Sequence, residues 1–305
     1  QLLLCRLLQA LGVGVGTVGS RAIIRDTHDA LGTARALGWI GAAMGIAPIV
    51  GPVIGGSLST WAGPQSVFLA SATLGLLVTL AMAVRLTETR HAADQLAVPQ
   101  DWTTSYRELL GSRVFIGYTL MYAFMQGCFF AFLAVAAVVF ADHLGINEAR
   151  FGAIWGGMGL AYVTGAMSGA RLTRRFSSRL LLLSSAVMIL LAGAALLAAN
   201  LVRGVTLSGL LLPLTLLMFA AGIQTPLSVA GAVNCRHDIA GTAAGLSSSL
   251  ALVLSGSFSI LSGFLYSGDF TPVAALIAGS AAMVGVTFMM TVESSHPWLP
   301  DSQKG

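Results

Sequence analysis

One charged residue, Arg6, lies inside an apolar stretch of this sequence, 15 residues before the next arginine, Arg21. That separation corresponds to about 22 Å along an α-helix. An arginine that deep in a bilayer costs at least ~2.5 kcal/mol, so such residues normally face a bundle interior or a wet cavity and belong to substrate or proton pathways. The alternative is that Arg6 extends its guanidinium to the outer membrane surface. The cost of burial favours the first interpretation, which places Arg6 in a polar core.

A titratable acid that could respond to Arg6 is missing from the apolar stretches. They contain no Asp, Glu or His, and the histidines occupy the loops and tails. Proton coupling usually needs a titrating group in the membrane. We therefore expect the matching carboxylate on helices outside this sequence, and we expect these 305 residues alone not to couple. An intramembrane enzyme would need a nucleophile–base pair or metal ligands at depth, and three widely spaced cysteines give no metal signature.

A second group of residues suits the binding of a small molecule. Tyr118, Tyr122 and Gln126 follow one another at four-residue spacing. A stripe that combines aromatic bulk with a few polar tips fits an amphipathic, mostly uncharged ligand. The alternative is a set of interfacial tyrosines with ordinary hydrogen bonds between helices. The candidate cavity residues are Tyr118, Tyr122, Met125, Gln126 and Phe130 and, beside Pro226, Gln224 and Thr225.

The composition indicates which elements must position these residues. Hydrophobic residues make up 56% of the chain and charged residues only 9%, with a mean hydropathy of +0.83, whereas soluble domains carry roughly 25% charged residues. Lipid must be the main solvent, and backbone groups in lipid are satisfied only in helices or closed barrels. The apolar runs are continuous instead of alternating, which predicts an all-α membrane protein. The net charge of +4 comes from arginines in short loops and indicates no nucleic-acid partner.

Nine stretches qualify to cross a bilayer core, which takes roughly 20 apolar residues. A longer polar segment separates the first three from the last six. The sequence thus predicts a three-helix remnant of an N-terminal half at 1–86, a linker at 87–113, a six-helix half at 114–293 and a tail at 294–305. The approximate limits of the stretches are 2–20, 37–60, 66–84, 114–140, 151–170, 180–200, 208–233, 240–265 and 272–292.

The positions of arginine and lysine orient these spans. Such residues concentrate in cytoplasmic loops, and here one set of alternate loops carries thirteen of them against two in the other. The linker and the C-terminus are therefore expected in the cytoplasm, and residue 1 towards the outside of a bacterial inner membrane. A six-plus-six carrier needs three more spans before the linker, so we expect nine helices of a twelve-helix monomer. The two outer arginines are Arg150 and Arg203.

Two faces of small residues let helix backbones approach closely. In a carrier whose two halves meet along these faces, they would form one surface on which the halves slide, as alternating access requires. The alternative is tight packing without a role in gating. Two prolines on the first face also predict a kink. The first face consists of Gly41, Gly45, Pro48, Pro52 and Gly56, and the second of Ala153, Gly157, Ala161, Gly165 and Gly169.

Two segments carry specific motifs. One runs from Arg6-Leu-Leu-Gln9-Ala-Leu-Gly12 to Ser20-Arg21-Ala-Ile-Ile-Arg25-Asp26, and the other is Gly38 followed by Ala47-Pro48-Ile-Val-Gly51-Pro52-Val-Ile-Gly55-Gly56. They resemble the fourth helix and the fifth-helix antiporter motif of the major facilitator superfamily, specifically of its bicyclomycin and chloramphenicol resistance branch. Ala47 stands where the general motif prefers glycine. The resemblance covers the whole chain in layout, but only about the first ninety residues carry specific motifs.

The resemblance implies roles for several residues. The branch's Arg-x-x-Gln-x-x-Gly motif matches Arg6, Gln9 and Gly12, and its arginine is implicated in proton coupling. In the superfamily the seventh helix lines the cavity, and the fifth and eighth helices meet between the halves. The half-to-half residues are then Gly38, Ala47, Pro48, Gly51, Pro52, Gly55 and Gly56 with Gly157, Ala161 and Gly165. A degraded copy of the cytoplasmic loop motif, without its aspartate, is a latch or a positive-inside anchor and contains Arg171, Arg174 and Arg175.

The function implied by the resemblance is proton-coupled efflux of small drug-like compounds by alternating access, without a cofactor. One alternative is a carrier of the same superfamily that works in uptake or metabolite exchange. Another is a truncated fragment that does not transport. An enzyme does not fit because the spans lack acids and histidines, and no loop is long enough to fold as the soluble domain of a receptor.

Overall fold

The protein is helical throughout the residues that its computed structural model describes, which are 1–27, 32, 50–85, 102–236 and 239–292. The expectation of an all-α protein is confirmed for this part of the chain. A further helical segment, residues 50–62, lies between α1 (Leu2–Thr27) and α3 (Gln65–Arg85) in the sequence. The helices are α1 (Leu2–Thr27), α3 (Gln65–Arg85), α4 (Trp102–Gly111), α5 (Arg113–Leu144), α6 (Glu148–Leu172), α7 (Ser178–Arg203), α8 (Leu207–Asn234), α9 (Ala240–Leu265) and α10 (Thr271–Val292).

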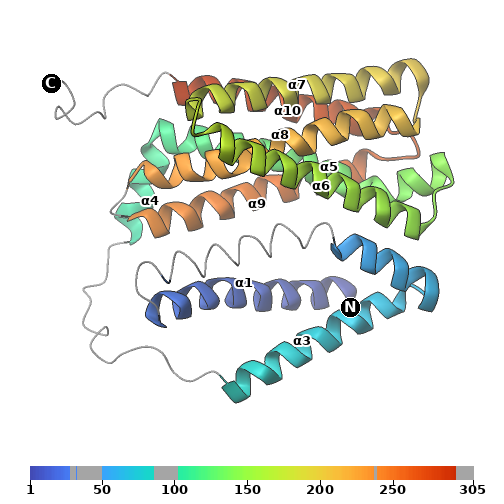
Figure 1. The fold of residues 1–305 in the computed structure, drawn as a ribbon, viewed down its shortest axis with the longest axis horizontal. Helices are drawn as coiled ribbons and strands as arrows, with labels where there is room; N and C mark the ends of the chain where they lie inside the picture. Colours follow the sequence, from blue (N-terminus) through green and yellow to red (C-terminus); the bar gives the residue numbers. More distant parts are fainter. Residues whose placement is uncertain (28–31, 33–49, 86–101, 237–238, 293–305) are drawn as a thin grey trace.

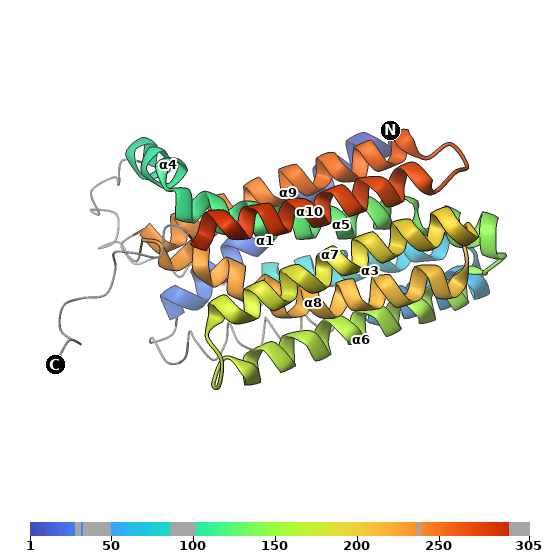
Figure 2. The same ribbon diagram turned by 90° about the horizontal axis from the view of Figure 1, so that it is seen from above.

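Helix α5 is the centre of a six-helix bundle formed by α5–α10. It packs against α8, α9 and α10, while α6 and α7 flank α8 (Figures 1 and 2). Large side chains that are fully buried run along its length, from Phe115 through Met121 and Phe132 to Phe140. Close packing of such side chains contributes most of the attraction between helices in lipid, where no hydrophobic driving force acts between them.

Hydroxyl groups add hydrogen bonds between α5 and its neighbours. The Thr119 hydroxyl donates to Ser247 Oγ at 3.1 Å, and Ser262 and Ser280 donate to backbone carbonyls of α5 at 2.6 and 2.7 Å. Bonds of this kind contribute on average about 0.6 kcal/mol each in a membrane. Side-chain oxygens also cap the first turns of α5, α6, α7 and α8, and the capping residues are Ser112, Asn147, Ser177 and Thr206.

Six of the described helices are long and apolar enough to cross a membrane: α3, α5, α7, α8, α9 and α10. Each coincides with a predicted span. Helix α1 has only a shorter apolar stretch, Leu4–Gly14, and α6 is diluted by glycine and polar residues. Most of the predicted span at 37–60 lies outside the described residues. The expected count of nine therefore stays a prediction.

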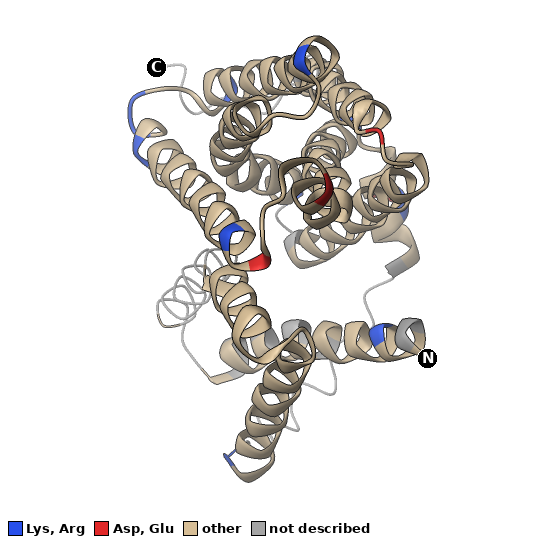
Figure 3. Ribbon diagram, turned by 90° about the vertical axis from the view of Figure 1, so that its right-hand side faces the viewer, with Lys and Arg blue, Asp and Glu red and all other residues tan. Residues whose placement is uncertain are grey.

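Charged residues lie mainly near the helix ends. Figure 3 looks onto the end of the bundle that holds Arg150 and Arg203, where most of the ribbon is uncharged. The opposite end carries α4. Successive helices of the bundle run in opposite directions, so the helix ends beside α4 can be read from the order of the helices. The described arginines at those ends are Arg107, Arg113, Arg171, Arg174, Arg175, Arg179 and Arg236. The arginine bias read from the sequence is thus a bias between the two ends of one bundle.

The helices before the bundle lie to one side of it (Figure 1). None of the described residues of α3 is buried, so both faces of this apolar helix are open to other chains or lipid. The segment predicted as a linker contains α4, which docks on the bundle through fully buried Leu109. Glu108 of α4 also pairs with Arg236 at 2.9 Å, but both side chains are more than 40% exposed, and such pairs contribute about 0–1 kcal/mol.

Candidate functional site

A cavity of about 940 Å³ opens between α5, α6 and α8. That volume is near the upper end of the usual range for small-molecule sites. Four of the seven residues predicted to bind a ligand line it: Tyr122, Met125, Gln126 and Thr225. The first three lie on α5 at the spacing that the sequence suggested, and Thr225 lies on α8. The wall formed by α6 was not selected from the sequence.

Aromatic rings form the wall between α5 and α6. Trp155 of α6 stacks on Phe132, with ring centres 6.0 Å apart and planes inclined by 10°. Phe129 contacts the same indole at 5.8 Å. Paired rings hold one another in fixed orientations and contribute about 0.5–1.5 kcal/mol beyond the area they bury. The result is a rigid, polarisable surface suited to a flat apolar group.

Methionines supply a second, adaptable part of the lining. Met125, Met158, Met167 and Met218 all line the cavity. Their unbranched side chains adjust to different shapes and make favourable contacts with rings. Among the described residues that line the cavity none is an Asp, Glu, Lys or Arg. The site can therefore accept bulky, uncharged ligands of varied shape, and it offers no fixed charge to a charged one.

Polar atoms without partners lie on one turn of α8 beside the cavity. The Gln224 amide donates to the Met121 carbonyl at 3.0 Å, which leaves Gln224 Oε1 without a partner among the described residues, together with the hydroxyls of Thr225 and Ser228. Next to them Pro226 cannot donate the helical hydrogen bond that the Gly222 carbonyl would otherwise accept. An unsatisfied buried polar group costs about 1–3 kcal/mol. This cluster is a place where the hydrogen-bonding group of a ligand, or water, would be stabilised.

Three of the predicted cavity residues lie outside its lining. Tyr118 packs its ring over Gly231 of α8, where a Cβ atom would come within 2.5 Å of Cε1. Phe130 contacts Phe129 edge to face at 5.4 Å. Gln224 is fully buried against α5, and its neighbour Thr225 is the residue that lines the space.

The contribution of α6 was missed in the sequence, although a signal was present. Trp155, Met158, Tyr162 and Ala166 recur at intervals of three or four residues and all line the cavity. That is the period of one helical face. The small residues on the same helix suggested a packing surface instead, and a helix can carry both on different faces.

Arg6 and Gln9 bond to each other. Arg6 Nη1 donates to Gln9 Oε1 at 2.8 Å, so the i, i+3 pair predicted as a polar core is a local unit. The guanidinium also lies over the ring of Phe68 on α3, 5.6 Å from its centre. A cation–π contact of this kind contributes about 0.5–2 kcal/mol. Among the described residues no acid pairs with Arg6.

The stretch from Gly38 to Gly56 that resembles the antiporter motif, called the antiporter segment below, contacts α6 of the bundle through its described part. Gly38, Ala47 and Pro48 lie outside the described residues, whereas Gly51, Pro52, Gly55 and Gly56 belong to the helix at 50–62. A Cβ atom on Gly56 would lie 2.7 Å from the Glu148 carbonyl oxygen, and one on Gly152 would overlap the carbonyl of Pro52. Ser59 also hydrogen-bonds to the Glu148 carboxylate. Absent side chains thus let the two backbones meet.

The glycine ridge of α6 is oriented differently from the expectation. Gly165 packs on the backbone of Phe219 in α8, and the added Cβ atom of Gly157 would meet nothing within 4 Å. Ala161 is half-buried against the core of the bundle. Gly165 and Ala161 therefore face into the bundle, Gly157 is exposed, and Gly152 makes the contact with the antiporter segment. Since α6 has small residues on several sides, their spacing alone could not tell which side faces which neighbour.

The three arginines of the loop motif lie at the end of α6. Arg171 is in its last turn, and Arg174 and Arg175 follow in an exposed turn closed by backbone hydrogen bonds of 3.3 and 3.0 Å. Their position agrees with an anchor at the membrane surface. The latch stays a prediction.

Known proteins share this sequence pattern and this arrangement of helices. The chain is 30% identical over 258 residues to multidrug resistance protein D of Escherichia coli (strain K12), 85% of this chain and 64% of the relative. It is 27% identical over 299 residues to an uncharacterised transporter of Bacillus subtilis (strain 168), a match that covers 94% of this chain and 73% of the relative. It is 28% identical over 261 residues to a chloramphenicol resistance protein of Pseudomonas aeruginosa, with 84% of this chain and 60% of the relative covered. The chain thus spans about two thirds of the length of these relatives.

The fold and the family agree. A bacterial homologue of the iron transporter ferroportin, solved in an inward-facing state, superposes with a TM-score of 0.59 at 11% identity, covering 88% of this chain and 65% of that one. The family described as Major Facilitator Superfamily matches residues 1–260. With most of its length matched and its helices arranged in the same way, this chain belongs to the Major Facilitator Superfamily of membrane transporters.

Proposed function

We propose that the full carrier exports small amphipathic, drug-like compounds in exchange for protons. The observation that carries this proposal is the uncharged cavity of about 940 Å³, with its aromatic wall, its methionines and its unpartnered polar atoms on α8. Such a lining favours compounds with an aromatic or bulky apolar part and one hydrogen-bonding group. Two relatives named for multidrug and chloramphenicol resistance support the same direction of transport.

Alternating access in this proposal uses the contact between the antiporter segment and α6. The contact involves the first turns of α6, at the end of the bundle that holds Arg150 and Arg203. By the positive-inside rule this end faces outwards. We infer that the contact closes the outer side of the carrier and separates when the halves rock apart.

Proton coupling is assigned to Arg6 and Gln9. Their mutual hydrogen bond and the Phe68 ring hold the guanidinium on α1. Because the described helices that can span a membrane contain no carboxylate at depth, the group that exchanges the proton is expected outside these helices.

Growth in the presence of antibacterial compounds tests the direction of transport. Expression of the natural full-length protein in a strain without its main efflux pumps should raise tolerance to several uncharged aromatic compounds, and Trp155→Ala should remove most of that gain because the ring wall collapses. The matched control is Trp61→Ala, since Trp61 is 88% exposed and belongs to none of the ring pairs of the described residues. Accumulation of a labelled nutrient without any gain in tolerance would favour uptake instead.

Thr225→Val should weaken transport of compounds that carry a hydrogen-bond donor or acceptor. Valine has the same shape as threonine but cannot bond, so the KM for such compounds should rise by about two- to tenfold, the equivalent of one hydrogen bond of 0.5–1.5 kcal/mol. Stability of the purified protein should not fall, because the hydroxyl that is lost has no partner among the described residues. The control, Thr164→Val, removes a hydroxyl that is already bonded to the Ala161 carbonyl. Equal KM values for Thr225→Val and the unaltered protein would contradict the assignment.

A further inference from the structure

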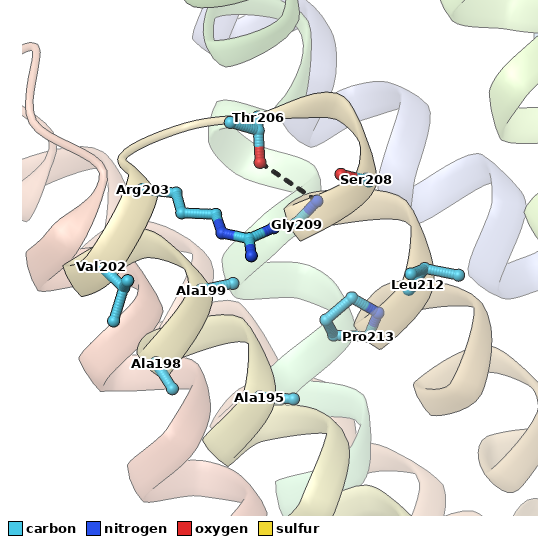
Figure 4. Close-up of a pocket in the computed structure, with 10 residues that line it drawn as sticks. All are labelled: Ala195, Ala198, Ala199, Val202, Arg203, Thr206, Ser208, Gly209, Leu212 and Pro213. Carbon is cyan, nitrogen blue, oxygen red and sulfur yellow. Dashed lines mark hydrogen bonds between the residues drawn. The ribbon is translucent and has the colours of Figure 1, made fainter.

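A second cavity, of about 410 Å³, lies between the end of α7 and the start of α8 (Figure 4). Its α7 wall consists of Ala195, Ala198 and Ala199, whose small side chains leave a crevice in front of Leu212 and Pro213 of α8. Leu212 is 74% exposed, so the crevice opens sideways, towards the surrounding membrane. An apolar crevice in that position has lipid chains as its ordinary neighbours.

A positive charge lies across the upper part of this crevice. Figure 4 shows Arg203 extending from the last turn of α7 towards Gly209 at the start of α8, with Ser208 and Thr206 beside it. Thr206 Oγ1 already accepts a hydrogen bond from the Gly209 amide at 3.2 Å. In the part of the chain that the structure describes, no carboxylate pairs with Arg203 and no bond engages the Ser208 hydroxyl.

The depth of the crevice matches part of one membrane leaflet. From Ala195 to Val202 the α7 wall rises about 10 Å at 1.5 Å per residue, and one leaflet of the hydrocarbon core is about 15 Å thick. Arg203 follows directly at the end of the helix, where headgroups begin. An apolar slot with a guanidinium at its outer end is complementary to a molecule with an acyl chain and a phosphate, because guanidinium groups bind phosphate oxygens in pairs.

We propose that this crevice binds one anionic phospholipid from the leaflet that faces the Arg203 end of the bundle. One acyl chain lies along the three alanines, and the phosphate is held by Arg203 and the Ser208 hydroxyl. A free anion would leave the alanine wall unused, and an uncharged apolar molecule would leave Arg203 unpaired. The lipid joins α7 to α8 at a site separate from the cavity between α5, α6 and α8, so the inference does not depend on what the carrier transports.

Native mass spectrometry of the full natural chain, released from detergent and titrated with dioleoylphosphatidylglycerol, tests this site. The unaltered protein should retain one tightly bound lipid. Arg203→Gln should lower its affinity about fivefold, since one basic residue near a membrane contributes about a factor of that size towards an anionic lipid. Arg203→Lys keeps the charge but loses the paired hydrogen bonds, so its affinity should lie between those of Arg203→Gln and the unaltered protein. The matched control is Arg150→Gln, which removes the other arginine at this end and should change nothing.

A second variant tests the acyl-chain slot. Ala198→Leu fills the crevice from the exposed side of α7 without touching Arg203, and it should also lower the affinity for the same lipid. Thermal unfolding of each variant shows whether the bundle is intact. Equal lipid retention by Arg203→Gln, Arg150→Gln and the unaltered protein would overturn the proposal, as would equal retention of dioleoylphosphatidylcholine. Displacement of the lipid by inorganic phosphate at equal concentration would assign the site to a small anion instead.

Discussion

Gly152→Ala should stop transport almost completely, although it adds a single methyl group. That methyl would overlap the Pro52 carbonyl on the antiporter segment, and the structure offers no flexible side chain that could move away. Overpacking of this kind costs about 1–3 kcal/mol, which displaces a two-state equilibrium by about 5- to 150-fold. Because the methyl blocks the closed contact, the carrier should remain open on the outer side. Gly56→Ala should act in the same direction, because its added Cβ atom would lie 2.7 Å from the Glu148 carbonyl oxygen.

Two controls distinguish the contact from an effect on the helices. At Gly55 and Gly157 an added Cβ atom would meet nothing within 4 Å, so Gly55→Ala and Gly157→Ala should transport normally. All four changes raise helix propensity by about 1 kcal/mol, and none should impair folding of its own helix. Transport in everted vesicles measures the transport rate. Opening of the outer side is measured by labelling a Ser59→Cys variant from outside, in a background in which Cys5, Cys128 and Cys235 are replaced. Equal rates for Gly152→Ala and Gly157→Ala would refute the assignment of this contact to the closed outer side.

Arg6→Ala should abolish proton-coupled efflux in the natural full-length protein. Removal of the guanidinium ends the hydrogen bond to Gln9 and the contact with Phe68. It also removes the positive charge that would favour the deprotonated form of a nearby carboxylate. The variant should still insert and fold, since a charge that costs at least ~2.5 kcal/mol at depth is lost and not gained. We expect efflux driven by a proton gradient to fall at least about tenfold, equivalent to ~1.4 kcal/mol.

The readout must separate coupling from binding. Everted vesicles with an imposed proton gradient report coupled transport, and downhill exchange of labelled substrate without a gradient reports the remaining steps. Arg6→Ala should lose the first and keep the second. Phe68→Leu removes only the ring contact and should retain coupling. Normal gradient-driven efflux by Arg6→Ala would assign this arginine to the membrane surface, as the alternative interpretation holds.

Most of the helices could be predicted because each local signal points the same way. The six predicted spans from 114–140 to 272–292 each fall within one helix of the bundle, and caps such as Ser112 and Asn147 stand where polar residues precede apolar runs. Part of the candidate cavity could also be predicted, since Tyr122, Met125 and Gln126 share one face of one helix. The wall formed by α6 could not. Trp155 reaches the same space from another helix, and only packing brings the two helices together.

Composition, periodicity and arginine placement by themselves determined that this chain is a helical membrane protein, where its helices in the bundle run and which of their ends carries the charge. These properties depend on the cost of placing polar groups in lipid, which each residue incurs independently of the fold. The tertiary structure alone decided that Gly152, and not Gly157, meets the antiporter segment, and that Gly165 packs inside the bundle. Small residues allow close approach on any side of a helix, so the partner is chosen by how whole helices pack.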